Sequence, residues 1–221
     1  MSELIKLEFP SNSFFVPAHT ITCFLSKLDL DLSKRLAEIV TKEEYNILIK
    51  TVKPDFIEDS SWLTGRLWSY NFLDFDYSEI KEFKNFIKEE YLKFSKELGH
   101  TIPNKTYIHC WANVLRKGGR PIAVHHHADG HVDAPQSYSY LSGNVSLQAD
   151  NTKTYYENPF TDEFQGIINT PGDLILFPSN IRHWTDKNES DNLRISLAFD
   201  IITEEVYNMS TTYNKHYREF I

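Results

Sequence analysis

The chain has 221 residues, of which 41% are hydrophobic and 24% charged, and its formal net charge is -8. This length suffices for one domain with a single core, and the mixture is typical of a globular protein rather than a disordered one. The acidic balance, without a run of Lys or Arg, argues against a nucleic-acid partner. The two cysteines, Cys23 and Cys110, form no CxxC motif, which argues against a disulfide framework and a cysteine-bound zinc.

The N-terminus, MSELIKLEFP, has no apolar run long enough for a signal peptide, and no later segment reaches membrane-spanning length. We therefore expect a cytoplasmic protein in a reducing compartment, without a membrane partner.

The first hundred residues predict strands and helices. Residues 14–25 are β-branched and aromatic, which predicts a strand or two, and residues 31–40 suit a helix. The clearest helix spans residues 76–99, where apolar residues recur at steps of three or four and form one packing face. Asp76 with the glutamate three residues later predicts a capping box, and Gly99 predicts the end of the helix.

From Thr101 to Ile202 the chain changes to short apolar segments between turn residues. The segments that predict strands are KTYIHCWANVLR, RPIAVHH, SYSYLSGNVSLQ, KTYYENP, GDLILFPS, RHWTD and LRISLAFDII. Short strands at this spacing favour a sandwich or a barrel.

We expect one domain over residues 1–221. Within it, residues 1–105 supply N-terminal strands and supporting helices, residues 106–202 the β core, and residues 203–221 a C-terminal tail or helix.

The segment HHHADGHVD concentrates histidines and aspartates over residues 125–133. Alternate residues of an extended strand point the same way, so a pair at positions i and i+2 suits one metal ion. Iron in oxygenases takes two imidazoles and often a carboxylate on one face, and the other positions stay open. Three registers fit such a pair: His125 with His127, His127 with Asp129, and His131 with Asp133. A solvent-exposed loop is the alternative.

A distant third ligand is predicted at His183, which follows the apolar strand and Pro-Ser turn of GDLILFPSNIRHW. A hydrogen-bonded core histidine is the alternative. Further along, Arg194 and Ser196 share one face of the strand LRISLAF. A buried arginine needs an anionic partner, and a ligand carboxylate held bidentately is a natural one. The alternative for Arg194 is an internal salt bridge to an aspartate.

Several short motifs follow one another in a set order between residues 107 and 201. They are Trp111-Ala112-Asn113, the cluster at 125–129, Leu141-Ser142-Gly143, Phe177-Pro178-Ser179, His183 and Arg194-Ile195-Ser196. In this combination the chain resembles the Fe(II)/2-oxoglutarate-dependent oxygenases, in the branch of prolyl-hydroxylase-like and phage-type proteins. The resemblance implies a mainly β fold with flanking helices, built around a double-stranded β-helix (a cupin-like jelly roll) over residues 106–202.

The resemblance also implies the chemistry. It implies Fe(II) as cofactor, 2-oxoglutarate and molecular oxygen as co-substrates, and hydroxylation of an unidentified small-molecule or peptide substrate with release of succinate and CO2. His183 would be the distal iron ligand. His127-x-Asp129 matches the usual carboxylate motif literally, whereas His125-x-His127 fits the spacing to the neighbouring motifs better, and His127 belongs to both.

For the co-substrate, the resemblance implies that Arg194 and Ser196 bind the far carboxylate of 2-oxoglutarate. Tyr140 would add a hydroxyl to that contact, and Asn113 would line the same pocket.

Two other functions remain open from the sequence. Gly119 followed by His125-x-His127 resembles the first motif of a cupin-type metalloprotein, which would not use 2-oxoglutarate. The glutamate of that motif is absent, however, and cupins have no need of Arg194 and Ser196. The second alternative is a non-enzymatic β-sandwich binding module.

Overall fold

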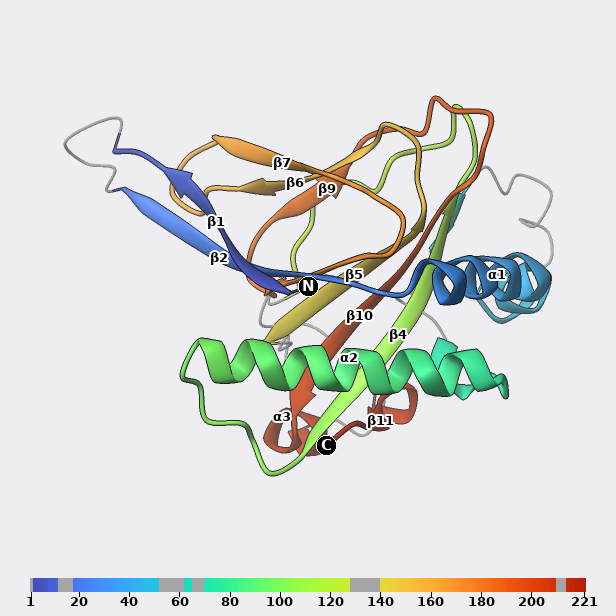
Figure 1. The fold of residues 1–221 in the computed structure, drawn as a ribbon, viewed down its shortest axis with the longest axis horizontal. Helices are drawn as coiled ribbons and strands as arrows, with labels where there is room; N and C mark the ends of the chain where they lie inside the picture. Colours follow the sequence, from blue (N-terminus) through green and yellow to red (C-terminus); the bar gives the residue numbers. More distant parts are fainter. Residues whose placement is uncertain (1, 12–17, 52–61, 65–69, 128–139, 210–213) are drawn as a thin grey trace.

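The computed structural model describes residues 2–11, 18–51, 62–64, 70–127, 140–209 and 214–221. These residues form two antiparallel sheets with helices packed against the larger one (Figure 1). The larger sheet has the strand order β1-β2-β8-β5-β10-β4-β11, and β3 also pairs with β4. Its strands are β1 (Glu3–Phe9), β2 (His19–Lys27), β3 (Trp62–Thr64), β4 (Thr106–Leu115), β5 (Leu141–Gln148), β8 (Asp173–Pro178), β10 (Arg194–Thr203) and β11 (Arg218–Glu219).

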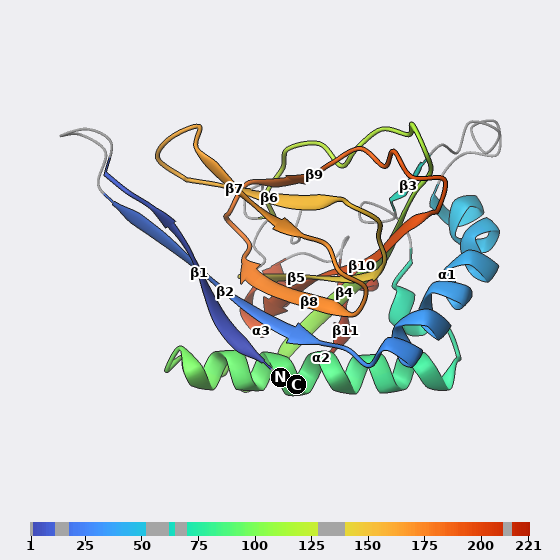
Figure 2. The ribbon, with the colours of Figure 1, turned by 45° about the horizontal axis from the view of Figure 1, so that its top comes forward.

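The smaller sheet has the order β7-β6-β9 and lies over the opposite face of the larger sheet from helix α2 (Figure 2). Its strands are β6 (Lys153–Glu157), β7 (Phe164–Ile168) and β9 (His183–Thr185). The helices are α1 (Leu30–Thr51), α2 (Ser78–Glu97), α3 (Glu204–Met209) and the 3-10 turns η2 (Phe72–Asp74) and η4 (Asn214–His216). No helix in the described part of the chain is both long and apolar enough to cross a membrane.

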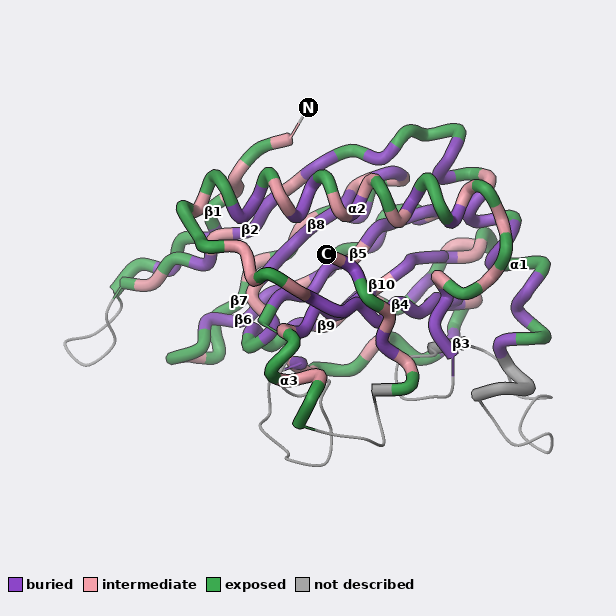
Figure 3. Tube along the Cα trace, turned by 90° about the horizontal axis from the view of Figure 1, so that it is seen from below, coloured by how far each residue is buried: buried purple, intermediate pink, exposed green. Residues whose placement is uncertain are grey.

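The larger sheet presents a different chemistry on each face because side chains alternate along a strand. On β10, the residues that join the apolar core against α1 and α2 are Ile195, Leu197, Phe199 and Ile201. The residues between them point to the smaller sheet: Arg194, Ser196, Ala198 and Asp200. Both faces are covered, so β4 is buried along its whole length and β10 along most of it (Figure 3). The polar face lies inside the molecule and can hold a site.

Helix α2 confirms the predicted packing face, since the side chains at the predicted positions are buried: Ile80, Phe83, Ile87, Tyr91 and Phe94. Gly99 has a φ of 66° and ends the helix as expected. The predicted capping box is wrong. The helix begins after Tyr77, which makes no side-chain capping bond, and Asp76 instead forms an ion pair with Lys81 at 2.8 Å.

Most predicted strands are present, with some corrections. The segment RPIAVHH forms no strand, and His125 makes only an isolated bridge to His183. A proline in this segment removes one donor from any ladder. Strands β1 and β7 were not predicted, and α1 continues to Thr51, beyond the predicted end at residue 40. The division at residue 105 stays a prediction, although β1 and β2 pair into the same sheet as the later strands.

Candidate functional site

Three histidines from two distant segments converge beneath the smaller sheet. His125, His127 and His183 each offer a ligand nitrogen, and these atoms all lie within 4.8 Å of one another. Backbone hydrogen bonds set this arrangement. His125 and His183 exchange N–H···O bonds of 3.1 and 2.9 Å, and the N–H of His127 donates to the carbonyl of Ser179 at 2.8 Å. The chain therefore reaches the i, i+2 geometry by bridging to β9 rather than by forming a strand of its own.

The ring orientation of His125 and His183 leaves one nitrogen of each for a metal. Nδ1 of His125 lies 2.7 Å from the carbonyl of Ala123, and Nδ1 of His183 lies 2.9 Å from the carbonyl of Ile181. A carbonyl only accepts, so each Nδ1 carries the proton and Nε2 has the lone pair. This is the usual arrangement of a metal-binding histidine, and the donor set fits a divalent transition metal.

The electrostatics also favour a neutral imidazole at His183. Burial lowers the pKa of His183 well below its usual value, and the neighbouring rings of His125 and His127 lower that pKa further. The neutral ring is the form that binds a metal.

His127 is held by a buried polar group that the sequence analysis missed. Its Nδ1 contacts the carboxylate of Asp200 and lies 3.0 Å from the hydroxyl of Ser142. The Ser142 hydroxyl also contacts Asp200 at 2.7 Å and the Ser179 hydroxyl at 2.8 Å. The sequence did contain a signal for Asp200, because it lies four positions after Ser196 and therefore on the same face of the strand.

The structure brings together His125, His127 and His183, which is one of the predicted registers. Asp129 lies outside the described residues, as do His131 and Asp133. The two registers that use these residues stay predictions.

Arg194 lies on the face of β10 that points to the smaller sheet, and strand β5 separates β10 from β8. The residue is only 1% exposed. Its Nε, Nη1 and Nη2 atoms have no hydrogen-bond partner among the described residues. Burial lowers the pKa of Arg194 to about 10, while Asp186 and Tyr156 act to raise it. The guanidinium is therefore a buried cation at neutral pH, and the internal salt bridge considered above is not formed within the described part of the chain.

Other polar groups lie near Arg194 in the sheets. Ser196 is paired with Asn113 across β10 and β4, and Nδ2 of Asn113 donates to the Ser196 hydroxyl at 3.5 Å. Oδ1 of Asn113 has no partner among the described residues. The buried hydroxyl of Tyr156, on β6, likewise finds none there, and burial raises its pKa well above the usual value. Tyr156 was missed because its strand gave no motif.

Tyr140 is not brought to this group. Its hydroxyl contacts the hydroxyl of Tyr91 on α2, on the helical side of the larger sheet. Its side chain is also 38% exposed. The contact with Tyr91 does not support the expectation that Tyr140 binds the co-substrate carboxylate, which stays a prediction.

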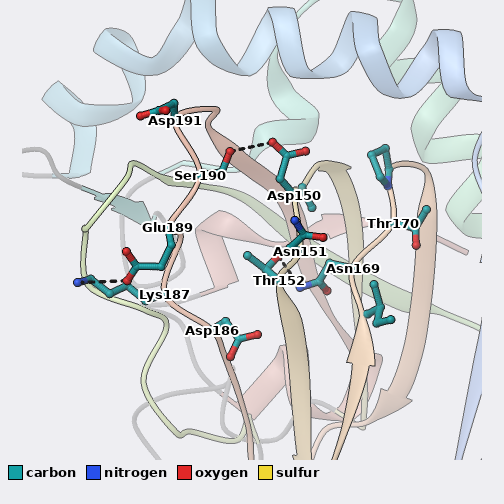
Figure 4. A pocket seen from close by; sticks show the side chains of 13 residues that line it. Asp150, Asn151, Thr152, Asn169, Thr170, Asp186, Lys187, Glu189, Ser190 and Asp191 are labelled. Carbon is teal, nitrogen blue, oxygen red and sulfur yellow. Dashed lines mark hydrogen bonds and ion pairs between the residues drawn. The ribbon is translucent and has the colours of Figure 1, made fainter.

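A small cavity of about 50 Å³ adjoins the three histidines, and its walls include Trp111, Asn113, Asn144 and Phe177. A much larger hollow of about 890 Å³ lies on the surface where the loops after β5, β7 and β9 meet (Figure 4). It carries several acidic side chains, but Asp150 already accepts hydrogen bonds from Ser190 and Asn192, each at 2.8 Å. None of the three histidines lines it, so the smaller cavity marks the candidate site.

Comparison with known proteins agrees with this placement. Residues 109–200 match the family described as "Putative 2OG-Fe(II) oxygenase". That span contains all three histidines, Arg194 and Ser196. Comparison with curated protein sequences gives no match.

Among solved structures, a prolyl-4-hydroxylase from Pseudomonas putida is similar with a TM-score of 0.59 and 12% identity, covering 82% of this chain and 92% of that chain. A prolyl hydroxylase from Trichoplax adhaerens, in complex with a hypoxia inducible factor peptide fragment, gives a TM-score of 0.61 and 12% identity, covering 86% of this chain and 87% of that chain. At these identities the likeness establishes the fold, which confirms the predicted jelly roll. The matched span, residues 109–200, carries the similarity to the Fe(II)/2-oxoglutarate-dependent oxygenases and covers less than half of the chain.

Proposed function

We propose that the protein is an Fe(II)- and 2-oxoglutarate-dependent dioxygenase that hydroxylates a small-molecule or peptide substrate. His125, His127 and His183 would bind the iron, and Arg194 would bind the distal carboxylate of 2-oxoglutarate. The observation that carries the proposal is the buried Arg194 guanidinium, without a hydrogen-bond partner among the described residues, on the same interior face as the histidine cluster.

The energetic argument rests on burial. An unpaired buried charge is costly, so a fold that retains one gains from a ligand that neutralises it. A carboxylate can accept two parallel N–H bonds from a guanidinium. Ser196 and Asn113 lie on the neighbouring strand positions and offer further polar contacts to the same carboxylate. A cupin-type site without 2-oxoglutarate gives no role to Arg194, and the family match also favours the oxygenase over a binding module.

In this proposal the residues of the chain bind and orient. The three imidazoles would hold the metal. Arg194 fixes the far end of the co-substrate, and the rings of Trp111 and Phe177 in the cavity wall exclude water. When bound, iron with 2-oxoglutarate and oxygen supplies an oxidant for C–H hydroxylation, with succinate and CO2 released.

The proposed substrate is a small molecule or a peptide. The similar Trichoplax adhaerens structure contains a peptide fragment, which supports keeping peptides among the candidates. A cytoplasmic location and the lack of nucleic-acid and membrane partners stay predictions.

An anaerobic titration of the metal-free protein with Fe(II), followed by 2-oxoglutarate, tests the proposal. We expect a weak visible charge-transfer band that requires both additions. His127→Ala should abolish the band, and Asp129→Ala should keep it if the ligands are the three histidines. Loss of the band in Asp129→Ala would assign the carboxylate register instead. Iron binding without any band would favour a cupin-type site, and no iron binding would refute the metal-dependent function.

A further inference from the structure

Asp200 is a buried carboxylate to which the proposed reaction assigns no role. It lies on the interior face of β10 and is 0% exposed. Its Oδ1 contacts Nδ1 of His127 and accepts a hydrogen bond from the Ser142 hydroxyl at 2.7 Å. A carboxylate in such a place is costly unless donors surround it, so its position next to one member of the histidine cluster calls for an explanation.

The three histidines differ in what holds their Nδ1 atoms. His125 and His183 are held by neutral backbone carbonyls, at 2.7 and 2.9 Å. His127 is held by the Asp200 carboxylate. A carboxylate partner orients a histidine ring and makes its other nitrogen a stronger ligand, and loss of such a partner typically weakens metal binding by about 10- to 100-fold.

The hydrogen bonds around Asp200 fix its position as well. The Ser142 hydroxyl has one proton, which it donates to Asp200, so the Ser179 hydroxyl donates to Ser142 at 2.8 Å. The carbonyl of Ser179 accepts the backbone N–H of His127 at 2.8 Å. The same turn therefore holds the backbone of His127 and, through Ser142, the group that holds its ring.

We propose that Asp200 is a positioning residue of the metal centre, which turns Nε2 of His127 toward His125 and His183 and adds a negative charge behind three neutral ligands. This inference rests on the proposed function, because it takes His127 as a metal ligand. It assigns the Asp200 carboxylate to holding a metal ligand rather than to binding the substrate.

Cobalt(II) is the probe for the test, because its visible absorption reports both affinity and ligand geometry. The full-length metal-free protein and Asp200→Asn are titrated side by side. Asparagine keeps the shape and an acceptor oxygen but removes the charge. We expect Asp200→Asn to bind Co(II) about 10- to 100-fold more weakly, with shifted absorption bands. The matched control is Asp173→Asn on β8, which removes a carboxylate that pairs with Lys27 on β2. The Co(II) affinity of this control should equal that of the wild type.

Ser142→Ala is the second variant, in case Asp200→Asn does not fold. It keeps the carboxylate but removes the hydroxyl that holds it, so its Co(II) affinity should also fall. If Asp200→Asn folds and its Co(II) affinity and spectrum are unchanged, the inference is overturned while the proposed function stands. If only Ser142→Ala folds, the same unchanged result in that variant overturns the inference. A wild-type protein that binds no Co(II) would overturn the proposed function, and the inference with it.

Discussion

Arg194 is a buried cation on the interior face of β10. The residue is 1% exposed, and its guanidinium nitrogens have no hydrogen-bond partner among the described residues. Leaving a buried polar group unsatisfied typically costs about 1–3 kcal/mol. In the proposed function, a co-substrate carboxylate would offset this cost.

We therefore expect Arg194→Met to raise the free energy of unfolding of the ligand-free protein by about 1–3 kcal/mol, measured by urea denaturation. The same variant should bind Fe(II) but lose the 2-oxoglutarate-dependent band. The control is Arg116→Met, which breaks a two-bond pair with Glu44 at 2.7 and 2.8 Å and should not stabilise the protein. A destabilised Arg194→Met variant would mean that Arg194 has a protein partner outside the described residues.

The packing beside the paired strands β5 and β10 depends on a residue without a side chain. Gly143 is paired with Phe199, and a Cβ atom at Gly143 would lie 2.2 Å from Cζ of Phe199 and 2.9 Å from Cδ2 of Leu176. The ring of Phe199 fills this space in the core against the helices. The glycine of the Leu-Ser-Gly motif therefore allows close packing on one face of the sheet. The neighbouring Ser142 contacts His127 on the other face.

Gly143→Ala should lower the free energy of unfolding by about 1–3 kcal/mol, because overpacking forces Phe199 or the strand to move. The measurement is urea denaturation, repeated in a Phe199→Leu background. There the cost of the alanine should be smaller, since the ring atoms that it meets are gone. Equal costs in both backgrounds would show that the strain arises elsewhere in β5.

The candidate site is formed by segments that are far apart in the sequence. The histidine cluster joins the loop before residue 128 to β9, and Asp200 joins that loop to β10. A metal that binds these groups in the folded state alone must stabilise the entire chain, because the unfolded chain does not bring them together.

At a free metal concentration 100-fold above the dissociation constant, the gain should be about 2.7 kcal/mol. For a chain of this length, that corresponds to a rise in Tm of about 5–11 °C. Thermal unfolding with Co(II), and again after removal of the metal by a chelator, measures the effect. The combined variant His125→Ala and His183→Ala should show no rise. A rise that persists in this variant would place the metal elsewhere on the chain.

Local patterns in the sequence were sufficient for the elements themselves. The apolar period of α2, its end at Gly99 and the strands β4, β5, β6, β8, β9 and β10 follow from side-chain spacing and turn residues, which act over a few positions. The same locality explains the errors. The predicted capping box does not form, and Asp76 makes an ion pair with Lys81 instead. Strands β1 and β7 were missed because edge strands take part of their stability from their partners.

The sequence by itself indicated the residue types of the candidate site: a histidine-rich segment with three possible ligand pairs, a distant histidine, and an arginine and a serine on one strand face. Only the tertiary structure decided how they combine. It brought His127 to Asp200 across 73 positions, turned Tyr140 toward Tyr91 on α2, and left the buried Tyr156 hydroxyl on β6 without a partner among the described residues. The physical reason is that such contacts depend on which strands pair and how the sheets stack, and these long-range choices leave no periodic signal in the chain.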